Sequence, residues 1–200
     1  MTKSILLVGV GGQGTILASK LLTIGLMQSG CDVKMSEIHG MSQRGGSVSS
    51  QVRYGKQVES PVIEKGGANI LVAFEKMEAL RWLEYLRPNG KVVVNDYAIS
   101  PMPVVSGVAP YPGGIVEELK ARAETVSMDA FGEAVKLGNP KVLNILLLGA
   151  TVAMMGLTDI NWNKIIADNV KPAFVELNQQ ALATGMRLVQ GETKAGGVRG

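Results

Sequence analysis

The sequence holds few of the residues from which metal and redox centres are built. There is one cysteine, Cys31, and one histidine, His39, in 200 residues. A single cysteine excludes an internal disulfide and any cysteine-ligated iron–sulfur cluster held by this chain alone. A single histidine argues against a zinc site of the usual histidine-rich kind. We therefore expect no metal site in the chain, and we expect Cys31 to fill space at the start of a strand.

Aromatic and charged side chains are scarce as well. The chain has three Phe, two Trp and four Tyr, charged residues make up 18%, and the formal net charge is +3. No basic cluster with interleaved aromatic residues is present, so a nucleic-acid partner is not expected. Hydrophobic residues make up 46%. With this length, that share is typical of one globular α/β domain with a sizeable core.

Signals for a membrane or for export are also missing. The longest apolar run, residues 142–157, is interrupted by Asn144 and by glycines, and it is shorter than the ~20 residues of a membrane span. A helix buried on most sides is the better interpretation. Residues 1–4 lead directly into another apolar run, without a small-residue cleavage site. These features predict a cytoplasmic location and no membrane partner.

The most informative stretch that is present is the glycine turn, Gly9-Val10-Gly11-Gly12-Gln13-Gly14. It follows the apolar run 5–8 and precedes a helical pattern over 13–29, which predicts the first strand–turn–helix unit of a doubly wound sheet. Gly9 would allow a tight turn, Gly11 a close approach of backbone to phosphate, and Gly14 close packing of helix on strand. The N-terminus of the helix would offer free N–H groups to an anion. By itself, this spacing fits a phosphate site and a purely structural turn equally well.

The remaining pattern predicts one domain over residues 1–190 and a flexible tail over 191–200. Polar and apolar residues alternate over 47–54, which indicates a strand that forms a β-hairpin or an antiparallel edge with 57–58. The expected fold is α/β: a three-layer, Rossmann-like, mostly parallel sheet with this antiparallel addition and a helical C-terminal part.

Individual elements follow from hydrophobic periodicity and from capping residues. Further strands are expected over 32–37, 70–74, 92–94 and 125–128. Helices are expected over 75–86, 130–137 and 162–169, together with a short helix that ends at about 122 and a last helix that begins at 172. A turn is expected at 87–90 and a loop over 100–112. The side chains of the first helix that are expected to face the sheet are Ile16, Leu17, Leu21, Ile24 and Met27.

Residues 38–46, Ile-His-Gly-Met-Ser-Gln-Arg-Gly-Gly, form a polar, glycine-rich loop without a helical period. Arg44 offers a planar guanidinium for a carboxylate or phosphate, or alternatively a salt bridge that fixes the loop. Ser42 and Ser47 can donate hydrogen bonds to the same anion. His39 can transfer a proton or serve as a structural residue. Glu37, at the end of the second predicted strand, can hold the ribose of a nicotinamide cofactor or be a solvated charge.

These candidates do not form a complete reactive set. No nucleophile–base pair, no metal ligand set and no second group of residues for hydride transfer accompany the glycine turn and the polar loop. The sequence therefore predicts a binding surface without chemistry of its own. One physical explanation is that the reactive centre belongs to another subunit.

The motifs together resemble a known family. The glycine turn, the loop Glu37-Ile38-His39-Gly40-Met41-Ser42-Gln43-Arg44-Gly45-Gly46-Ser47-Val48 and the pair Ser60-Pro61 are similar to the gamma-type subunit of 2-oxoacid:ferredoxin oxidoreductases, and closest to its indolepyruvate type. The resemblance covers about residues 3–188 and extends through Ala73-Phe74-Glu75, Arg87-Pro88-Asn89-Gly90 and Asn139-Pro140. The glycine turn alone is weak evidence, whereas the turn combined with the loop is specific.

The resemblance implies a part of an oxidative decarboxylase. Such enzymes use thiamine diphosphate with Mg to decarboxylate a 2-oxoacid, here an aryl pyruvate, pass electrons through iron–sulfur clusters to ferredoxin, and form an acyl-CoA. The thiamine site and the clusters would lie in a larger partner subunit, so no cofactor is assigned to this chain alone. The residues expected to receive the phosphates of coenzyme A or the partner's surface are Gly9, Gly11, Gly12, Gln13, Gly14, Ser42, Gln43, Arg44, Gly45, Gly46 and Ser47.

Two alternatives stay open on the sequence alone. The glycine turn would also suit a free-standing NAD(P)-dependent reductase, for which tight NADH binding and unaided activity would be the evidence. The chain can also be a non-catalytic interaction module whose glycine turn binds nothing. Co-purification with a large thiamine- and cluster-bearing chain would separate a complex subunit from that module.

Overall fold

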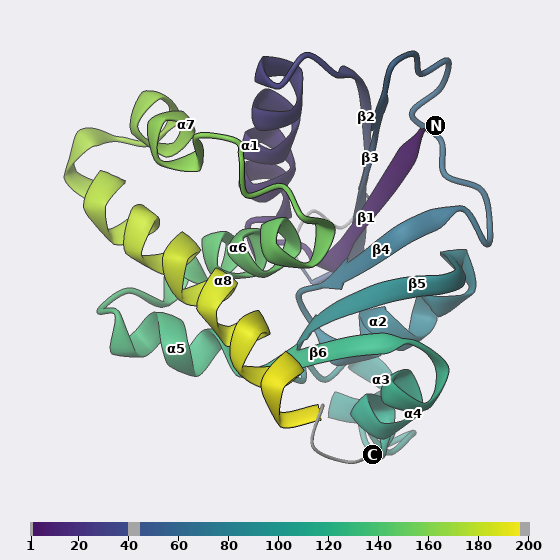
Figure 1. Ribbon diagram of the computed structural model, residues 1–200. Coiled ribbons are helices and arrows are strands. Elements are labelled where there is room, and N and C mark those ends of the chain that lie inside the picture. The colour runs from purple at the N-terminus through teal and green to yellow at the C-terminus, as the bar shows by residue number, and fades with distance from the viewer. Residues whose placement is uncertain (1, 40–44, 197–200) are drawn as a thin grey trace.

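The computed structural model describes residues 2–39 and 45–196, with only the backbone for 192–196. Within this part, six strands form one sheet in the order β2-β3-β1-β4-β5-β6, with helices on both faces (Figure 1). β3 runs antiparallel to both of its neighbours, and the three other strand pairs of the described sheet are parallel. The strands are β1 (Lys3–Val10), β2 (Asp32–His39), β3 (Ser47–Gly55), β4 (Ala68–Ala73), β5 (Leu86–Asn95) and β6 (Glu124–Met128).

The helices form the two outer layers of the predicted three-layer α/β arrangement. Figure 1 shows α1, α6 and α8 on one face of the sheet, and α2 and α4 on the other. The α-helices are α1 (Thr15–Gln28), α2 (Lys76–Arg81), α3 (Met102–Val105), α4 (Ile115–Arg122), α5 (Ala130–Lys136), α6 (Leu143–Met155), α7 (Trp162–Asn169) and α8 (Val175–Gly196), and three short 3₁₀ turns cover Leu83–Tyr85, Pro140–Val142 and Pro172–Phe174.

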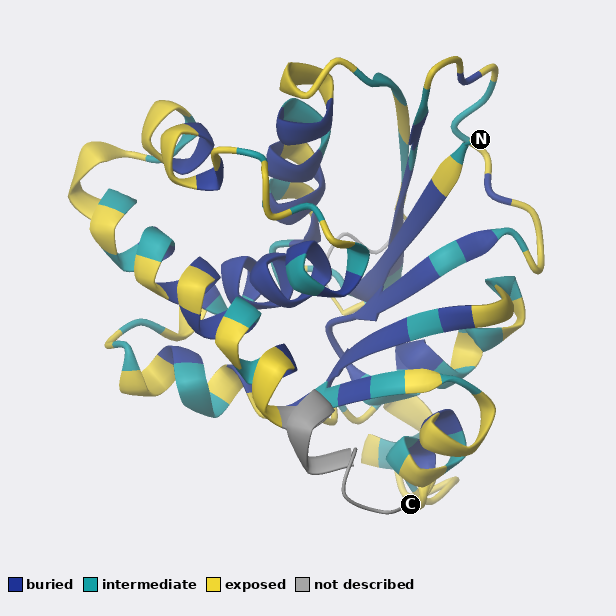
Figure 2. Cartoon of the chain, in the orientation of Figure 1, coloured by how far each residue is buried: buried dark blue, intermediate teal, exposed yellow. Residues whose placement is uncertain are grey.

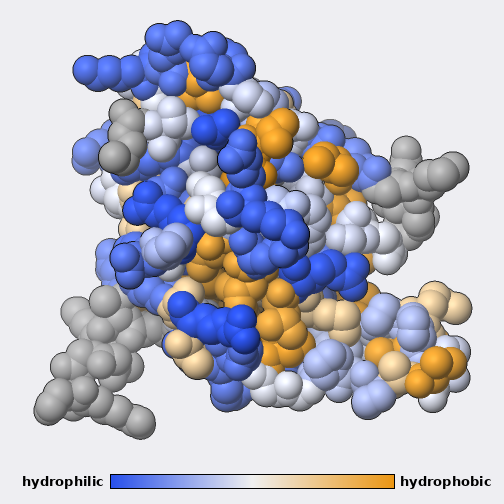
Figure 3. Space-filling view, turned by 90° about the vertical axis from the view of Figure 1, so that its right-hand side faces the viewer, coloured by the Kyte–Doolittle hydropathy of each residue, from blue (hydrophilic) through white to orange (hydrophobic). Residues whose placement is uncertain are grey.

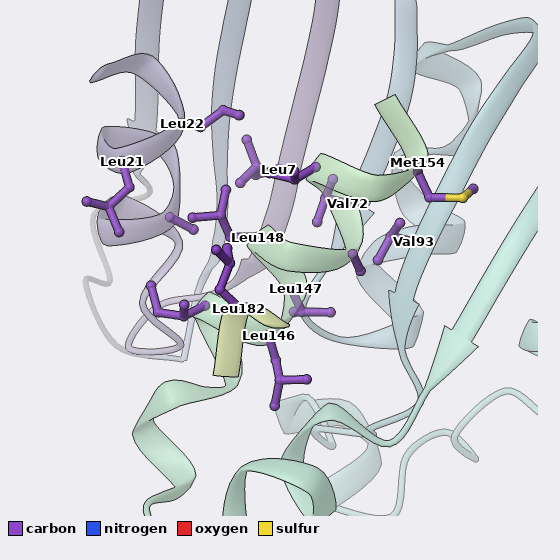
Figure 4. Close-up of a cluster of buried hydrophobic side chains, with 14 of the residues drawn as sticks. Leu7, Leu21, Leu22, Val72, Val93, Leu146, Leu147, Leu148, Met154 and Leu182 are labelled. Carbon is purple, nitrogen blue, oxygen red and sulfur yellow. The ribbon is translucent and has the colours of Figure 1, made fainter. Parts of the chain in front are cut away.

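Alternation along β1 divides the core into two clusters. Ile5 and Leu7 join the larger cluster under α1, α6 and α8, whereas Leu6 and Val8 join the smaller one under α2 and α4. Successive side chains of a strand point to opposite faces, so this strand is buried on both. Figure 4 shows the larger cluster, in which Leu21 and Leu22 of α1 lie near Leu148 of α6.

Helix α6 is the central helix of the molecule, as its apolar sequence predicts. Most of its side chains are buried, and Figure 2 shows it dark blue behind the partly exposed α8. Glycines bring α6 and α8 into backbone contact, because a β-carbon on Gly149 would overlap the carbonyl of Leu182 and one on Gly185 the carbonyl of Leu146. No helix in the described residues combines the length and the apolar character that crossing a membrane requires.

The position of β3 differs from the prediction. The strand lies between β2 and β1, in the interior of the sheet and not at its edge, and residues 57–58 form no strand. The segment after β3 instead covers one face of that strand: the Gln51 side chain accepts a hydrogen bond from the N–H of Ile63 at 2.6 Å, and Arg53 donates to the carbonyls of Ser60 and Val62. Period-two alternation predicts a strand but does not identify the strands with which it pairs.

The buried face of α1 and the bounds of several other elements also differ from the prediction. On α1, Ile16 and Met27 are exposed instead of facing the sheet, whereas Leu21 is buried as predicted. The helix expected over 75–86 ends at Arg81, and the turn expected at 87–90 is an irregular first part of β5, with Asn89 at φ 59°. The expected loop 100–112 contains α3, and α8 continues to Gly196.

Capping and turn signals were more reliable. Gly30 ends α1 with φ 85°, and its neighbour Cys31 is half-buried against the core. Asp129 caps α5 by accepting a hydrogen bond from the N–H of Gly132 at 2.8 Å. Asn139 accepts from the N–H of Lys141 at 3.0 Å and so begins the turn that leads into α6.

Candidate functional site

The glycine turn joins β1 to α1 and is closed by its own glutamine. The side-chain oxygen of Gln13 accepts from the N–H of Val10 at 2.7 Å, and its side-chain nitrogen donates to the carbonyl of Phe74 at 3.0 Å. A β-carbon on Gly9 would lie 2.8 Å from the Gln13 oxygen and 2.9 Å from Phe74 Cβ. The lack of a side chain at Gly9 therefore allows Gln13 and Phe74 to pack against the backbone of the turn. Gly12 supplies the positive φ, at 103°, that the turn needs.

Gly11 is bonded to the end of the polar loop. Its N–H donates to the carbonyl of Gly46 at 2.9 Å, and its carbonyl accepts from the N–H of Gly45 at 3.5 Å. This pairing brings the glycine turn and the glycine pair 45–46 together, as the sequence suggested. It also occupies the Gly11 N–H, so the donors available to an anion are those of the first turn of α1, which have no intrahelical partner.

The start of α1 is uncapped and lies against α6. Gly14, at φ 84°, occupies the N-cap position without a side-chain hydrogen bond, and the first turn carries no acidic residue. A β-carbon on Gly14 would lie 2.6 Å from the side-chain nitrogen of Asn144, which donates to the Gly14 carbonyl at 3.2 Å. Gly14 thus permits close packing on α6, not on the strand as expected. The partial positive charge of the helix is left for a ligand.

A hollow of about 400 Å³ opens at this uncapped end. We call it the glycine hollow, and its lining includes Gly12, Gly14, Thr15 and His39. His39 is on the same face of β2 as Glu37, because alternate residues of a strand share a face. The His39 ring nitrogen Nε2 lies 3.8 Å from Glu37 Oε2, and the Ser19 hydroxyl of α1 donates to the other carboxylate oxygen at 3.0 Å. The structure therefore brings His39, but not Glu37, to the wall of the hollow.

Ser47 faces a different hollow on the other side of the glycine turn. This hollow, of about 390 Å³, is lined by Val10, Gly46, Ser47, Glu75 and Glu78 among others, and we call it the glutamate hollow. The Ser47 hydroxyl donates to Glu78 at 2.5 Å, so this hydroxyl proton is not available to an anion in the glycine hollow. Ser42, Gln43 and Arg44 lie outside the described residues, and their expected roles stay predictions.

Two buried carboxylates of the glutamate hollow were not identified from the sequence as site residues. Glu75, 1% exposed, accepts from the N–H groups of Glu78 and Ile99 and from the Tyr111 hydroxyl. Burial first, and then the hydrogen bond to Glu75, raise the pKa of Tyr111. Glu78, 4% exposed, also lies 3.5 Å from Arg81 Nε. The available signal was the position of Glu75 directly after a buried strand.

A third opening, of about 560 Å³, lies near the start of β5 and is lined by Arg81, Arg87 and Arg122 together with Leu80, Leu83 and Leu86. Figure 3 shows the right-hand side of the molecule as seen in Figure 1, where hydrophobic residues gather in the middle among hydrophilic ones.

In the described residues, no three His, Cys, Asp or Glu side chains are grouped as they would be around a metal ion.

Comparison with known proteins identifies relatives of this chain. Residues 4–188 match the family model described as pyruvate ferredoxin/flavodoxin oxidoreductase. The chain is 35% identical over 192 residues to the indolepyruvate oxidoreductase subunit IorB of Pyrococcus horikoshii, a match that covers 92% of this chain and 94% of that subunit.

Solved structures share the fold. The gamma subunit of a keto/oxoacid ferredoxin oxidoreductase from Geobacter sulfurreducens superimposes with a TM-score of 0.70 at 24% identity, covering 94% of this chain and 99% of that one. The 2-oxoglutarate:ferredoxin oxidoreductase from Magnetococcus marinus, solved with 2-oxoglutarate, coenzyme A and succinyl-CoA bound, superimposes with a TM-score of 0.73 at 17% identity. That match covers 95% of this chain but only 31% of the longer chain.

Proposed function

The chain belongs to the pyruvate ferredoxin/flavodoxin oxidoreductase family, as a subunit of a 2-oxoacid:ferredoxin oxidoreductase, and on this premise we propose that its glycine hollow binds the phosphates of coenzyme A. The 2-oxoacid is an aryl pyruvate such as indolepyruvate, by likeness to the 35% identical relative. A larger partner subunit supplies thiamine diphosphate, Mg and the iron–sulfur clusters, and ferredoxin takes the electrons. The complex works in the cytoplasm.

The observation that carries this proposal is the uncapped start of α1, which opens into the glycine hollow. Free N–H groups and the positive end of a helix dipole together favour an anionic phosphate. His39 adds a ring N–H as a further donor at the wall. The site lies beyond the carboxyl ends of β1 and β2, because Gly11 follows β1 and His39 ends β2, and this is where open α/β sheets bind ligands.

A division of labour between two subunits is supported by the composition of the site. The described residues hold no metal-type ligand group, and the glycine hollow has donors but no nucleophile–base pair. In the Magnetococcus marinus protein, a similar fold is a part of a longer polypeptide. In the proposed complex, this chain holds and orients coenzyme A, while bond breaking takes place on the partner's cofactor.

The pair Gly12→Ala and Gly30→Ala tests the role of the glycine hollow. Both glycines have positive φ, at 103° and 85°, and a β-carbon on either meets nothing within 4 Å. Each substitution should therefore cost a similar ~1–2 kcal/mol of stability. Only Gly12→Ala puts a methyl group at the glycine hollow, so only this variant should raise the KM for coenzyme A, by about tenfold, the equivalent of ~1.4 kcal/mol of lost binding.

The assay uses the complex reconstituted with the larger subunit, and co-purification checks that both variants still assemble. An equal KM for coenzyme A in both variants would contradict the proposal. Tight NADH binding with turnover by the chain alone would indicate the free-standing reductase instead. Failure to co-purify with any thiamine- and cluster-bearing chain would favour a non-catalytic interaction module.

A further inference from the structure

The connection between β5 and α4 carries no charged side chain. Residues 97–114 contain no Asp, Glu, Lys or Arg, although these four types make up 18% of the chain. We call this segment the uncharged loop, and none of its residues is buried. Charged side chains lie mostly on protein surfaces, but the centre of a protein–protein interface has few of them. The composition of the loop is therefore typical of a surface that is covered in an assembly.

Large apolar side chains project from the uncharged loop. Met102 and Val105, at the two ends of α3, are 75% and 67% exposed, and Val108 is 81% exposed. In the described chain, α3 has no buried residue and makes only slight contact with other helices and strands. Figure 1 shows it at the lower right, away from α1, α6 and α7. These side chains form an apolar patch that the chain itself leaves uncovered.

A pair of aromatic rings extends the apolar surface to α5. Tyr97 begins the loop and stacks on Phe131, with the ring centroids 5.4 Å apart, and both residues are more than a third exposed. Val135, one turn further along α5, is exposed as well. Tyr97 follows β5 and Phe131 follows β6, so the pair lies at the carboxyl edge of the sheet. Aromatic side chains are enriched where proteins bind one another.

The uncharged loop is attached near both of its ends to one buried carboxylate. Glu75 accepts hydrogen bonds from the N–H of Ile99 at 3.2 Å and from the hydroxyl of Tyr111. Within the loop, the N–H of Val108 donates to the carbonyl of Pro103 at 2.9 Å. A loop that is already held in one conformation loses little entropy when a partner binds it. Glu75 thus presents the apolar side chains in a preformed arrangement.

The uncharged loop and the glycine turn lie on the same hollow. The loop lines the glutamate hollow through Pro101 and Met102, and Val10 and Gly46 line it as well. Gly46 also accepts the hydrogen bond from the N–H of Gly11 in the turn. A macromolecule that covers the turn from the carboxyl edge of the sheet therefore meets the loop too.

We propose that the uncharged loop is the surface on which the larger partner subunit docks, through an apolar patch of its own. This inference rests on the proposed function, in which that subunit brings its cofactor to the glycine turn. The occupant is this subunit and not a second copy of the chain, because the loop adjoins the place where the subunit must act. Met102, Val105 and Val108 become buried on assembly, and Tyr97 with Phe131 extends the contact.

The test measures the Kd between the purified full chain and the larger subunit. Val105→Asp and Val108→Asp each put a carboxylate into the proposed contact, so each should raise this Kd about tenfold, and the double variant about a hundredfold. Both side chains are exposed in the free chain, so its thermal midpoint should stay nearly unchanged. Val62→Asp is the matched control, because Val62 is 55% exposed but precedes β4, and it should keep the Kd within about twofold.

Photo-cross-linking is the second measurement. A benzophenone side chain placed at position 108 should cross-link to the larger subunit on illumination, and one placed at position 62 should not. A cross-link from position 108 to a second copy of the chain alone would assign the loop to self-association and overturn the inference. Sedimentation of the free chain would then show a dimer that the double variant makes monomeric.

The inference is also overturned if the double variant binds the larger subunit as tightly as the wild-type chain, or if Val62→Asp weakens binding as much. In either case, a raised KM for coenzyme A in Gly12→Ala would leave the proposed function standing, because that assay does not depend on where the larger subunit docks. A wild-type chain that fails to associate with the larger subunit would remove both.

Discussion

The glycine hollow and the glutamate hollow lie on either side of the same turn, and they differ in how fully their polar groups are paired. In the glycine hollow, the first turn of α1 is uncapped and has no acidic residue. In the glutamate hollow, Glu75 alone accepts three hydrogen bonds, and Glu78 is bound to Ser47. Under the proposed function, the unused donors lie on the binding side, whereas the satisfied carboxylates connect the start of α2 to Ser47, Ile99 and Tyr111.

Among the substitutions that test this difference, Glu75→Ala is expected to have the largest effect on stability. Glu75→Ala leaves the N–H groups of Glu78 and Ile99 and the Tyr111 hydroxyl without their acceptor. We expect a loss of about 3–5 kcal/mol in the free energy of unfolding, because several buried donors are orphaned at once. Urea denaturation measures it, with Asp96→Ala as the control, because Asp96 is an exposed carboxylate that forms an ion pair with Lys76. A loss below ~1 kcal/mol would mean that the hydrogen bonds of Glu75 contribute little to the stability of the fold.

Tyr111 should show a smaller effect that depends on pH. Tyr111→Phe removes one donor to Glu75 and should cost about 1 kcal/mol at pH 7. Because folding raises the pKa of Tyr111, the folded protein holds the proton more tightly. Its stabilising contribution is therefore complete below about pH 10 and is lost as the pH rises further. The thermal midpoint of the wild-type protein should fall more steeply above pH 10 than that of the variant.

Tyr54→Phe is the comparison for Tyr111→Phe. Burial raises the pKa of Tyr54 to about 12, but no described residue partners its buried hydroxyl. This substitution should leave stability at pH 7 unchanged or slightly higher, while it also reduces the alkaline loss. Equal costs for the two substitutions at pH 7 would show that the hydrogen bond to Glu75 contributes nothing.

The smallest effect on coenzyme A use is expected for Ser47→Ala, which tests directly whether the two hollows have separate roles. The Ser47 hydroxyl donates to Glu78 in the glutamate hollow, so its loss should cost about 1 kcal/mol of stability. The KM for coenzyme A should stay within about twofold of wild type, a difference of ~0.4 kcal/mol. A tenfold rise in that KM, with stability unchanged, would place Ser47 with the ligand as the sequence suggested and would break the contrast.

Local sequence signals predicted most of the elements and the identity of the turn. The glycines at 9–14, the cap at Asp129 and the glycine at 30 all act within a few residues of themselves, so a linear pattern can reveal them. The family resemblance was confirmed over residues 4–188. The position of His39 was not predicted: it was expected in the loop after the second strand, but it ends β2 and lines the glycine hollow.

Relations between distant segments could not be predicted in this way. The approach of Asn144 to Gly14 spans 130 positions, and nothing near Gly14 signals it. The insertion of β3 between β2 and β1 depends on strand order, which alternation does not encode. The exposure of Ile16 and Met27 shows that α1 presents a different face to the sheet than its aliphatic residues alone suggested.

The backbone contact of α6 with α8 has a consequence for which molecules the protein accepts. Gly149 and Gly185 lock these helices together, and Asn144 ties α6 to the start of α1. The wall of the glycine hollow at the start of α1 therefore rests on a rigid pair of helices. Under the proposed function, the protein selects its ligand by a preformed shape and does not reshape the hollow around it.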